Sequence, residues 1–322
     1  MATPLIGHGE ISIYADDRIN LPTSYAKKYR EQVDGLRKRL ESKISDDPAF
    51  DLVKMLHAGS VAKGTALRTI NDLDVAVYVR KGDAPLSDGE LMPWLKGLLE
   101  NTYPNMESGQ FSVEDHCVTV TFKGSGLDVD VVPVLYEDDP KDFGYLIRKH
   151  SGQRVLTSIP LHLEFIRKRK AKYGDNFAQL IRFVKWWRLQ RCEIDKDFRF
   201  KSFMIELIWA YLADSGISLD DYPTALEAFF NFVVTTELKS RIVFSDYYAT
   251  SEIPKTSLGA IEVFDPVNPD NNVGRNYEDV DRLRIVSAAH EALDSLSEAR
   301  FATTKQDALE CWQDVLGKGF KG

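Results

Sequence analysis

Residues 56–79, LHAGSVAKGTALRTINDLDVAVYV, decide the fold of this chain. The stretch ends in an apolar run that carries two carboxylates, Asp72 and Asp74. We predict a strand at residues 73–79, with Asp74 inside it and Asp72 immediately before it. Because successive side chains of a β-strand point to opposite faces, these two acids project from the same face. Carboxylates held this close repel each other, so the pattern predicts a positive partner. We expect two Mg²⁺ ions, with Mn²⁺ as an alternative, because such ions bind few carboxylates and take other ligands from water and phosphate.

A second acidic strand, LDVDVVPV at residues 127–134, supplies a candidate for the third carboxylate of a two-metal site. Asp128 and Asp130 share one face of this strand, and spacing alone excludes neither. We favour Asp130, which is followed by an apolar pair and then by Pro133, expected to end the pairing. Two metals about 3.5–4 Å apart stabilise both the attacking and the leaving oxygen of a phosphoryl displacement. The predicted catalytic and metal-binding set is Asp72, Asp74 and Asp130.

A glycine turn lies upstream of the first acidic strand. Gly59-Ser60 follows a predicted strand at residues 52–58 and precedes Lys63. Glycine permits the backbone conformations of a tight turn, and the turn amides together with a serine hydroxyl can hold phosphate groups. We therefore predict nucleotide contacts at Gly59, Ser60 and Lys63.

This combination of a Gly-Ser turn, an acid-x-acid strand and a distant third acid resembles the polymerase-β-like nucleotidyltransferases. Within that superfamily, GSVAKGTA at residues 59–66 and DVDVVPV at residues 128–134 are similar to the cGAS/DncV-like and oligoadenylate-synthase-like enzymes of bacterial anti-phage signalling. Two later stretches agree with the resemblance. They are LIRFVKWWRLQ (180–190) with KSFMIELIWAYL (201–212), and DPVNPDNNVGRN (265–276).

The resemblance implies roles for three further residues. Lys185 and Ser202 match the lysine and the serine that contact the donor triphosphate in the family, and Asn272 matches a nucleotide contact in the Asp-Pro…Asn-Asn-Val segment. The residues by themselves leave other readings open. Lys185 is equally well a surface residue, Ser202 a helix N-cap, and Asn272 a loop residue that binds local backbone.

The pattern along the chain predicts an α+β architecture with two lobes. We expect a nucleotidyltransferase lobe at residues 1–140, with a mixed sheet and an N-terminal helix that in the resembled family spans both lobes. A helical lobe at residues 141–322 then completes the nucleotide cleft. Residues 1–20 look irregular, the basic run RKRKAK (167–172) is typical of a solvated face or of nucleotide attraction, and 241–244 suggests a short strand. Helices are expected at 25–44, 88–99, 160–173, 180–190, 201–212, 223–235, 277–296 and 306–316, and further strands at 112–122 and 127–134.

Composition restricts the class of protein. The 322 residues, 43% of them hydrophobic, suffice for a substantial core. No run of eighteen apolar residues occurs, and the N-terminus lacks a basic region followed by an apolar one, so we expect a cytoplasmic protein without a membrane segment. The three cysteines lack metal-binding spacing. A net charge of −8 disfavours a duplex nucleic acid as activator.

The three acids and the resemblance together predict a nucleotidyltransferase that makes a cyclic di- or trinucleotide second messenger. It would join ribonucleoside triphosphates with release of pyrophosphate, in CBASS-type anti-phage signalling. ATP is the expected substrate, with GTP or pyrimidine nucleotides as alternatives. Two other functions stay open: modification of tRNA or protein, and a catalytically silent nucleotide-binding scaffold. A regulatory or conjugating protein partner is also expected, with Gly322 as a candidate conjugation site.

Overall fold

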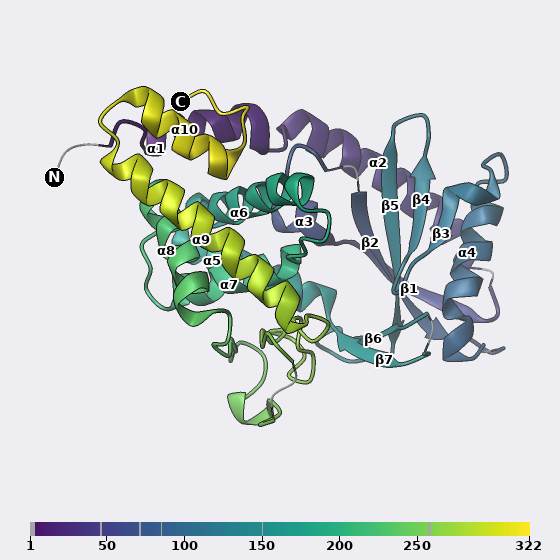
Figure 1. The fold of residues 1–322 in the computed structure, drawn as a ribbon. Helices are drawn as coiled ribbons and strands as arrows, with labels where there is room; N and C mark the ends of the chain where they lie inside the picture. The colour runs from purple at the N-terminus through teal and green to yellow at the C-terminus, as the bar shows by residue number, and fades with distance from the viewer. Residues whose placement is uncertain (1–3, 46, 71, 85, 150, 257–258) are drawn as a thin grey trace. The chain divides into compact units, whose positions relative to one another are not determined.

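The chain forms two compact units in the computed structural model, which describes residues 4–45, 47–70, 72–84, 86–149, 151–256 and 259–322 (Figure 1). One unit is Leu21–Glu164, and we call it the sheet unit. The other combines Met1–Asn20 with Phe165–Gly322, and we call it the helical unit. The α+β fold class is confirmed, and each unit is described by itself below.

The sheet unit is built on a mixed sheet with the strand order β1-β2-β5-β4-β3. The central strands β2 and β5 run parallel, and the other pairs are antiparallel. The predicted antiparallel hairpin of β4 and β5 is confirmed. The strand bounds are β1 Phe50–His57, β2 Asp72–Lys81, β3 Phe111–Val113, β4 Val118–Phe122, β5 Leu127–Tyr136, β6 Gly144–Ile147 and β7 Arg154–Thr157.

The two faces of this sheet differ in chemistry because side chains alternate along β2 and β5. One face carries valines such as Val75 and Val129 and packs against the helices α2 (Thr23–Ile44) and α4 (Leu91–Thr102) in a single apolar core. Burial of each valine or leucine there stabilises the fold by about 2 kcal/mol. The opposite face begins with the carboxylates and continues into a small cluster around Tyr78. The predicted strand with acid on one face is confirmed.

Two expectations about the end of β5 are wrong. Pro133 does not end the pairing, because it lies opposite Val77 within the β2–β5 pair. On the other side of β5, the residues before Pro133 pair with β4 and the residues after it pair with β6. The lobe boundary also does not follow residue 140. The strands β6 and β7 extend the sheet from β5, so residues 141–164 stay in the sheet unit.

The N-terminal twenty residues belong to the helical unit rather than to the predicted first lobe. The expectation of an irregular segment is wrong for residues 8–19, which are helical: α1 spans His8–Tyr14 and a π-helix spans Ala15–Ile19. The Tyr14 hydroxyl donates a hydrogen bond to the Leu316 carbonyl oxygen at 3.2 Å, which ties this segment to the far end of the chain. The predicted long helix near residues 25–44 is α2, and it lies in the sheet unit.

The helical unit confirms the predicted run of helices, shown in Figure 1 from teal to yellow. Its core includes Trp187, which is buried and meets the rings of Phe198 and Phe230 edge-on. The expected strand at 241–244 is a single bridge between Ile242 and Val263. No helix in the described part of the chain is long and apolar enough to cross a membrane. The helix α5, Ile159–Tyr173, begins in the sheet unit and continues into the helical unit at Phe165. The other helices of this part of the chain are α6 Asp175–Ile194, α7 Ser202–Asp214, α8 Tyr222–Thr236, α9 Asp279–Phe301 and α10 Lys305–Leu316.

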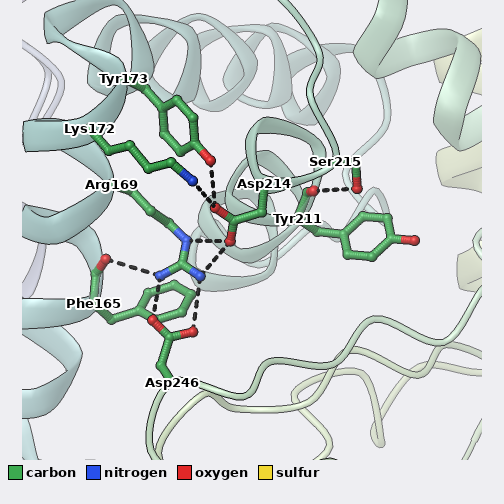
Figure 2. Close-up of polar contacts among 8 residues, drawn as sticks. All are labelled: Phe165, Arg169, Lys172, Tyr173, Tyr211, Asp214, Ser215 and Asp246. Atoms are coloured by element: carbon green, nitrogen blue, oxygen red, sulfur yellow. Dashed lines mark hydrogen bonds and ion pairs between the residues drawn. The ribbon is translucent and has the colours of Figure 1, made fainter.

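The basic run on α5 is not uniformly solvated. Arg169 is buried, with its guanidinium 3.7 Å from the centre of the Phe165 ring. Figure 2 shows that it donates hydrogen bonds to two carboxylates, at 2.9 Å to Asp214 and at 2.9 Å to Asp246. The neighbouring Lys172 stays exposed at the edge of this network. Arg169 therefore joins α5 to the end of α7 and to the loop after residue 241.

Candidate active site

Four carboxylates line up on one face where β2 and β5 run side by side. The parallel register places Asp72 opposite Asp128 and Asp74 opposite Asp130. All four side chains point to the face away from α2 and α4, because Leu73 and Val129 between them enter the apolar core. The predicted acids Asp72, Asp74 and Asp130 are thus brought together from strands more than fifty residues apart in sequence.

Gly59 packs directly against the carboxylate of Asp74. Its backbone is in the left-handed region, with φ +64°, and a Cβ atom placed there would lie 1.6 Å from Asp74 Oδ2. The Ala58 amide also donates a hydrogen bond to the Asp74 carbonyl oxygen at 2.9 Å. Glycine is therefore required for two reasons, conformation and space. The Gly-Ser turn and the acidic strand form one packed unit.

Asp130 lies in a different environment from the other acids. The Thr119 hydroxyl donates a hydrogen bond to Asp130 Oδ1 at 2.6 Å. Burial raises the pKa of Asp130 above its ordinary value, the neighbouring charges of Asp72 and Asp128 raise it further, and the Thr119 bond opposes them. Burial, together with the charges of Asp130 and Asp74, raises the pKa of the nearby Cys117 thiol to about 12, so that thiol stays protonated at neutral pH.

This donor set fits a hard divalent cation. Four carboxylates supply only oxygen ligands and a concentrated negative charge, which Mg²⁺ and Mn²⁺ prefer. Repulsion among them is what a bound cation would relieve. Within the described ranges, no three His, Cys, Asp or Glu side chains already converge on one point as a finished metal site.

The remaining predicted residues of the glycine turn lie on a short helix, α3 (Gly59–Lys63). Ser60 is its second residue and is partly exposed, and its carbonyl oxygen accepts a hydrogen bond from the Thr65 amide at 2.9 Å. Lys63 is the last residue of α3 and precedes Gly64, which has a left-handed backbone. Both are close in sequence to the acidic face, and their contacts to nucleotide remain predictions.

Lys185 is buried and is therefore not a surface residue. Its side chain is only 4% exposed, and its ammonium group lies 2.6 Å from the Oε1 atom of Glu206, which is 3% exposed. A buried ion pair of this kind links α6 to α7 inside the helical unit. The contact of Lys185 with the triphosphate stays a prediction.

Ser202, the first residue of α7, has a partner that the sequence did not suggest. Arg188, one turn after Lys185 on α6, donates a hydrogen bond from Nη1 to Ser202 Oγ at 3.3 Å. The helical spacing of Lys185 and Arg188 was the only signal in the sequence, and helical spacing alone does not reveal which basic side chain is buried.

Asn272 is a structural residue of its loop. It is buried, its side-chain oxygen accepts hydrogen bonds from the amides of Val263 and Gly274, and its amide donates to the Ile261 carbonyl oxygen at 2.8 Å. These bonds satisfy the side chain within the loop. The observed role of Asn272 is to hold local backbone, and the nucleotide contact stays a prediction.

Comparison with known proteins places this arrangement in a family. Residues 11–157 match the family model described as "Second Messenger Oligonucleotide or Dinucleotide Synthetase domain". The whole chain is 45% identical, over 322 residues and 100% of both proteins, to the cyclic AMP-AMP-AMP synthase of Escherichia coli strain MS 115-1. It is 30% identical, over 318 residues, to the CBASS oligonucleotide cyclase CdnC of E. coli strain KTE188, covering 97% of this chain and 96% of that one.

This chain also superposes on solved structures of related proteins over nearly its full length. E. coli MS115-1 CdnC with ATP superposes with a TM-score of 0.90 at 45% identity, covering 99% of this chain and 100% of that one. The same protein in complex with HORMA-deltaN gives a TM-score of 0.89, covering 98% and 99%. Vibrio cholerae DncV bound to GTP shares the fold, with a TM-score of 0.73 at 13% identity, covering 98% and 96%. The chain therefore belongs to the CD-NTase family, the cGAS/DncV-like nucleotidyltransferases that include the CBASS oligonucleotide cyclases.

Proposed function

We propose that this nucleotidyltransferase joins three molecules of ATP into a cyclic oligoadenylate messenger and releases pyrophosphate at each step. The observation that carries the proposal is the register that sets Asp72, Asp74 and Asp130 on one face of the sheet beside the Gly59 turn. The choice of ATP and of a three-nucleotide ring is supported by the name of the full-length relative and by the ATP complex of CdnC.

Different residues of the chain would bind the cations and the triphosphate. Asp72 and Asp74 would hold divalent cations together with Asp130, whose Oδ1 is fixed by Thr119. When bound, such cations lower the pKa of a ribose hydroxyl and offset the charge that develops on the transferred phosphate. Ser60 would orient the triphosphate from the turn. Closing the ring requires the same phosphoryl transfer, so one acidic face serves every step.

Incubation with labelled ATP, GTP, CTP and UTP in the presence of Mg²⁺ or Mn²⁺ tests the proposal. After phosphatase treatment, mass spectrometry should find a resistant small product that contains only AMP units. Label retained on RNA or on protein, without a small product, would instead support a tRNA- or protein-modifying transferase. If Asp74→Asn leaves activity unchanged, the face is not catalytic and the scaffold alternative gains.

A protein of the HORMA class is the partner we propose for regulation. The support is the complex that the 45% identical CdnC forms with HORMA-deltaN. Copurification of the tagged chain with such a protein, followed by the product assay with and without it, tests this step. The proposal fails if neither binding nor a change in product formation is found. Conjugation through Gly322 remains a prediction.

A further inference from the structure

The strand β1 leads into the glycine turn, yet it lies at the edge of the sheet. It comes first in the order β1-β2-β5-β4-β3, and among the strands of the described residues it pairs with β2 alone. Its last residue, His57, lies opposite Val75, which follows Asp74 in β2. The turn at Gly59 begins two residues after His57. Because an edge strand has ladder hydrogen bonds on one side only, the position of the turn depends on what holds the outer side of β1.

The helix α2 holds the outer side of β1 through Asp34 and Arg37. Asp34 Oδ1 lies 3.0 Å from His57 Nε2, and since a carboxylate only accepts, the imidazole N–H is the donor. Arg37 donates from Nη1 to the same Oδ1 atom at 3.2 Å and from Nη2 to the Met55 carbonyl oxygen at 2.8 Å. Met55 and His57 both belong to β1. The helix therefore holds β1 at two points, and we call these four residues the α2 clamp.

A small cavity lies beside the α2 clamp, under the glycine turn. Its volume is about 20 Å³, and its lining includes His57, Ala58 and Asp74 together with Val33 of α2. A space of this size has room for about one water molecule. Close packing of side chains therefore does not by itself fix the turn against α2 at this point. The hydrogen bonds of the clamp join α2 to β1 next to this gap.

We infer that Asp34 is a positioning residue for the carboxylate of Asp74. Asp34 accepts hydrogen bonds from both His57 and Arg37 and so keeps the end of β1 in place. The next residue, Ala58, then donates its amide to the Asp74 carbonyl oxygen at 2.9 Å. The Asp34 side chain is 49% exposed, so its ion pairs add little to global stability, and its effect belongs to catalysis. The inference rests on the proposed function, because it takes Asp74 as a catalytic residue.

The test compares Asp34→Ala with Asp34→Asn, which keeps one side-chain oxygen as an acceptor. Glu31→Ala is the matched control, because Glu31 lies one turn earlier on α2 and its side chain is 66% exposed. The measurements are kcat and KM for ATP in product formation, the melting temperature, and hydrogen exchange of residues 56–65 by mass spectrometry without nucleotide. That segment includes the Ala58 amide, whose hydrogen bond to Asp74 protects it from exchange.

We expect Asp34→Ala to lower kcat by about tenfold, less than the roughly 100-fold that a full 1 Å displacement of a catalytic group costs. KM should change by less than about threefold, and the melting temperature should stay close to that of the wild type. Residues 56–65 should exchange faster, while α4 exchanges as before. Asp34→Asn should lose less activity, and Glu31→Ala should match the wild type.

A folded Asp34→Ala variant with the kcat of the wild type, or with unchanged exchange of residues 56–65, would overturn the inference. If Asp34→Ala does not fold, His57→Ala removes the same hydrogen bond from the strand side and is judged by the same two criteria. A wild type that forms no product from any nucleoside triphosphate would instead refute the proposed function. The exchange results would then still decide whether Asp34 holds the turn.

Discussion

Gly59 lies against the carboxylate of Asp74, so this carboxylate has no room to move toward the glycine turn. The left-handed backbone of Gly59 and the position of Asp74 Oδ2 leave no room for a methyl group. The same carboxylate is expected to bind a cation on its open side. The absence of a side chain at Gly59 thus sets the position of the Asp74 carboxylate, whose catalytic role is proposed above.

Gly59→Ala should abolish most of the activity with a smaller effect on folding. The added Cβ forces the Asp74 carboxylate aside, and a displacement of about 1 Å in a catalytic group costs on the order of 100-fold in rate. The left-handed backbone adds roughly 1 kcal/mol of strain. Product formation and urea unfolding measure the two effects. Gly35→Ala, at an open position of α2, is the control and should keep full activity. An active Gly59→Ala variant would show that the packing against Asp74 is not needed.

At the scale of elements, the alternation of acids with apolar residues made β2 and β5 predictable from sequence. The hairpin register between β4 and β5 also placed Thr119 opposite Asp130, although the sequence did not single it out. Short elements escaped prediction: β6 and β7 have four residues each, too few for a period to be recognised. The burial of Lys185 and Arg169 depends on acids that other elements bring to them, so local pattern could not reveal it.

The ion pairs of Arg169 with Asp214 and Asp246 are expected to contribute to the stability of the helical unit. Arg169→Ala leaves the carboxylates of Asp214 and Asp246 without their shared partner and removes the stacking on Phe165. Breaking a buried ion pair from one side costs about 3–5 kcal/mol. The free energy of unfolding, measured in urea, should fall by that amount. Lys172→Ala, at the exposed edge of the network, should leave it nearly unchanged because an exposed ion pair contributes little, and equal effects would contradict the assignment.

The short 3-10 helix Asp88–Glu90, just before α4, supplies a pH-dependent contribution to stability. Asp88 accepts a hydrogen bond from Arg154 at 2.6 Å and pairs with Lys81 at 2.8 Å, and the Arg154 bond is the main reason that its pKa is lowered. A lowered folded pKa means that this stability is present above the ordinary Asp value and is lost as the pH falls through the folded value.

Asp88→Asn should therefore lower the free energy of unfolding by about 1 kcal/mol at pH 7, and the difference from the wild type should shrink toward zero as the pH falls below the ordinary Asp value. Chemical denaturation across this pH range measures the effect. Asp83→Asn removes the same charge at an exposed position nearby and should have no such pH dependence. A difference for Asp88→Asn that is constant with pH would refute the explanation.

At the scale of the whole molecule, the predicted site residues fall into two parts, one in each unit. The sheet unit carries the carboxylates that the proposed cations require, and the helical unit carries Ser202, whose contact to the triphosphate stays a prediction. Sequence identified the first part almost completely because acids on strands follow a simple period. It suggested Ser202 only through a family resemblance, and it did not reveal that Lys185 is buried, because the partner Glu206 lies on a different helix.

The most direct test of the central claim is product formation from ATP and Mg²⁺ by Asp130→Asn and Asp128→Asn, beside the wild type. Both variants remove one charge from the same face of β5, and their melting temperatures report folding. The account predicts that Asp130→Asn lowers the rate by about 1,000-fold or more, as expected for a group that acts as part of a catalytic set, whereas Asp128→Asn stays within about tenfold. A folded Asp130→Asn variant with a near-normal rate, or a larger loss for Asp128→Asn, would contradict it.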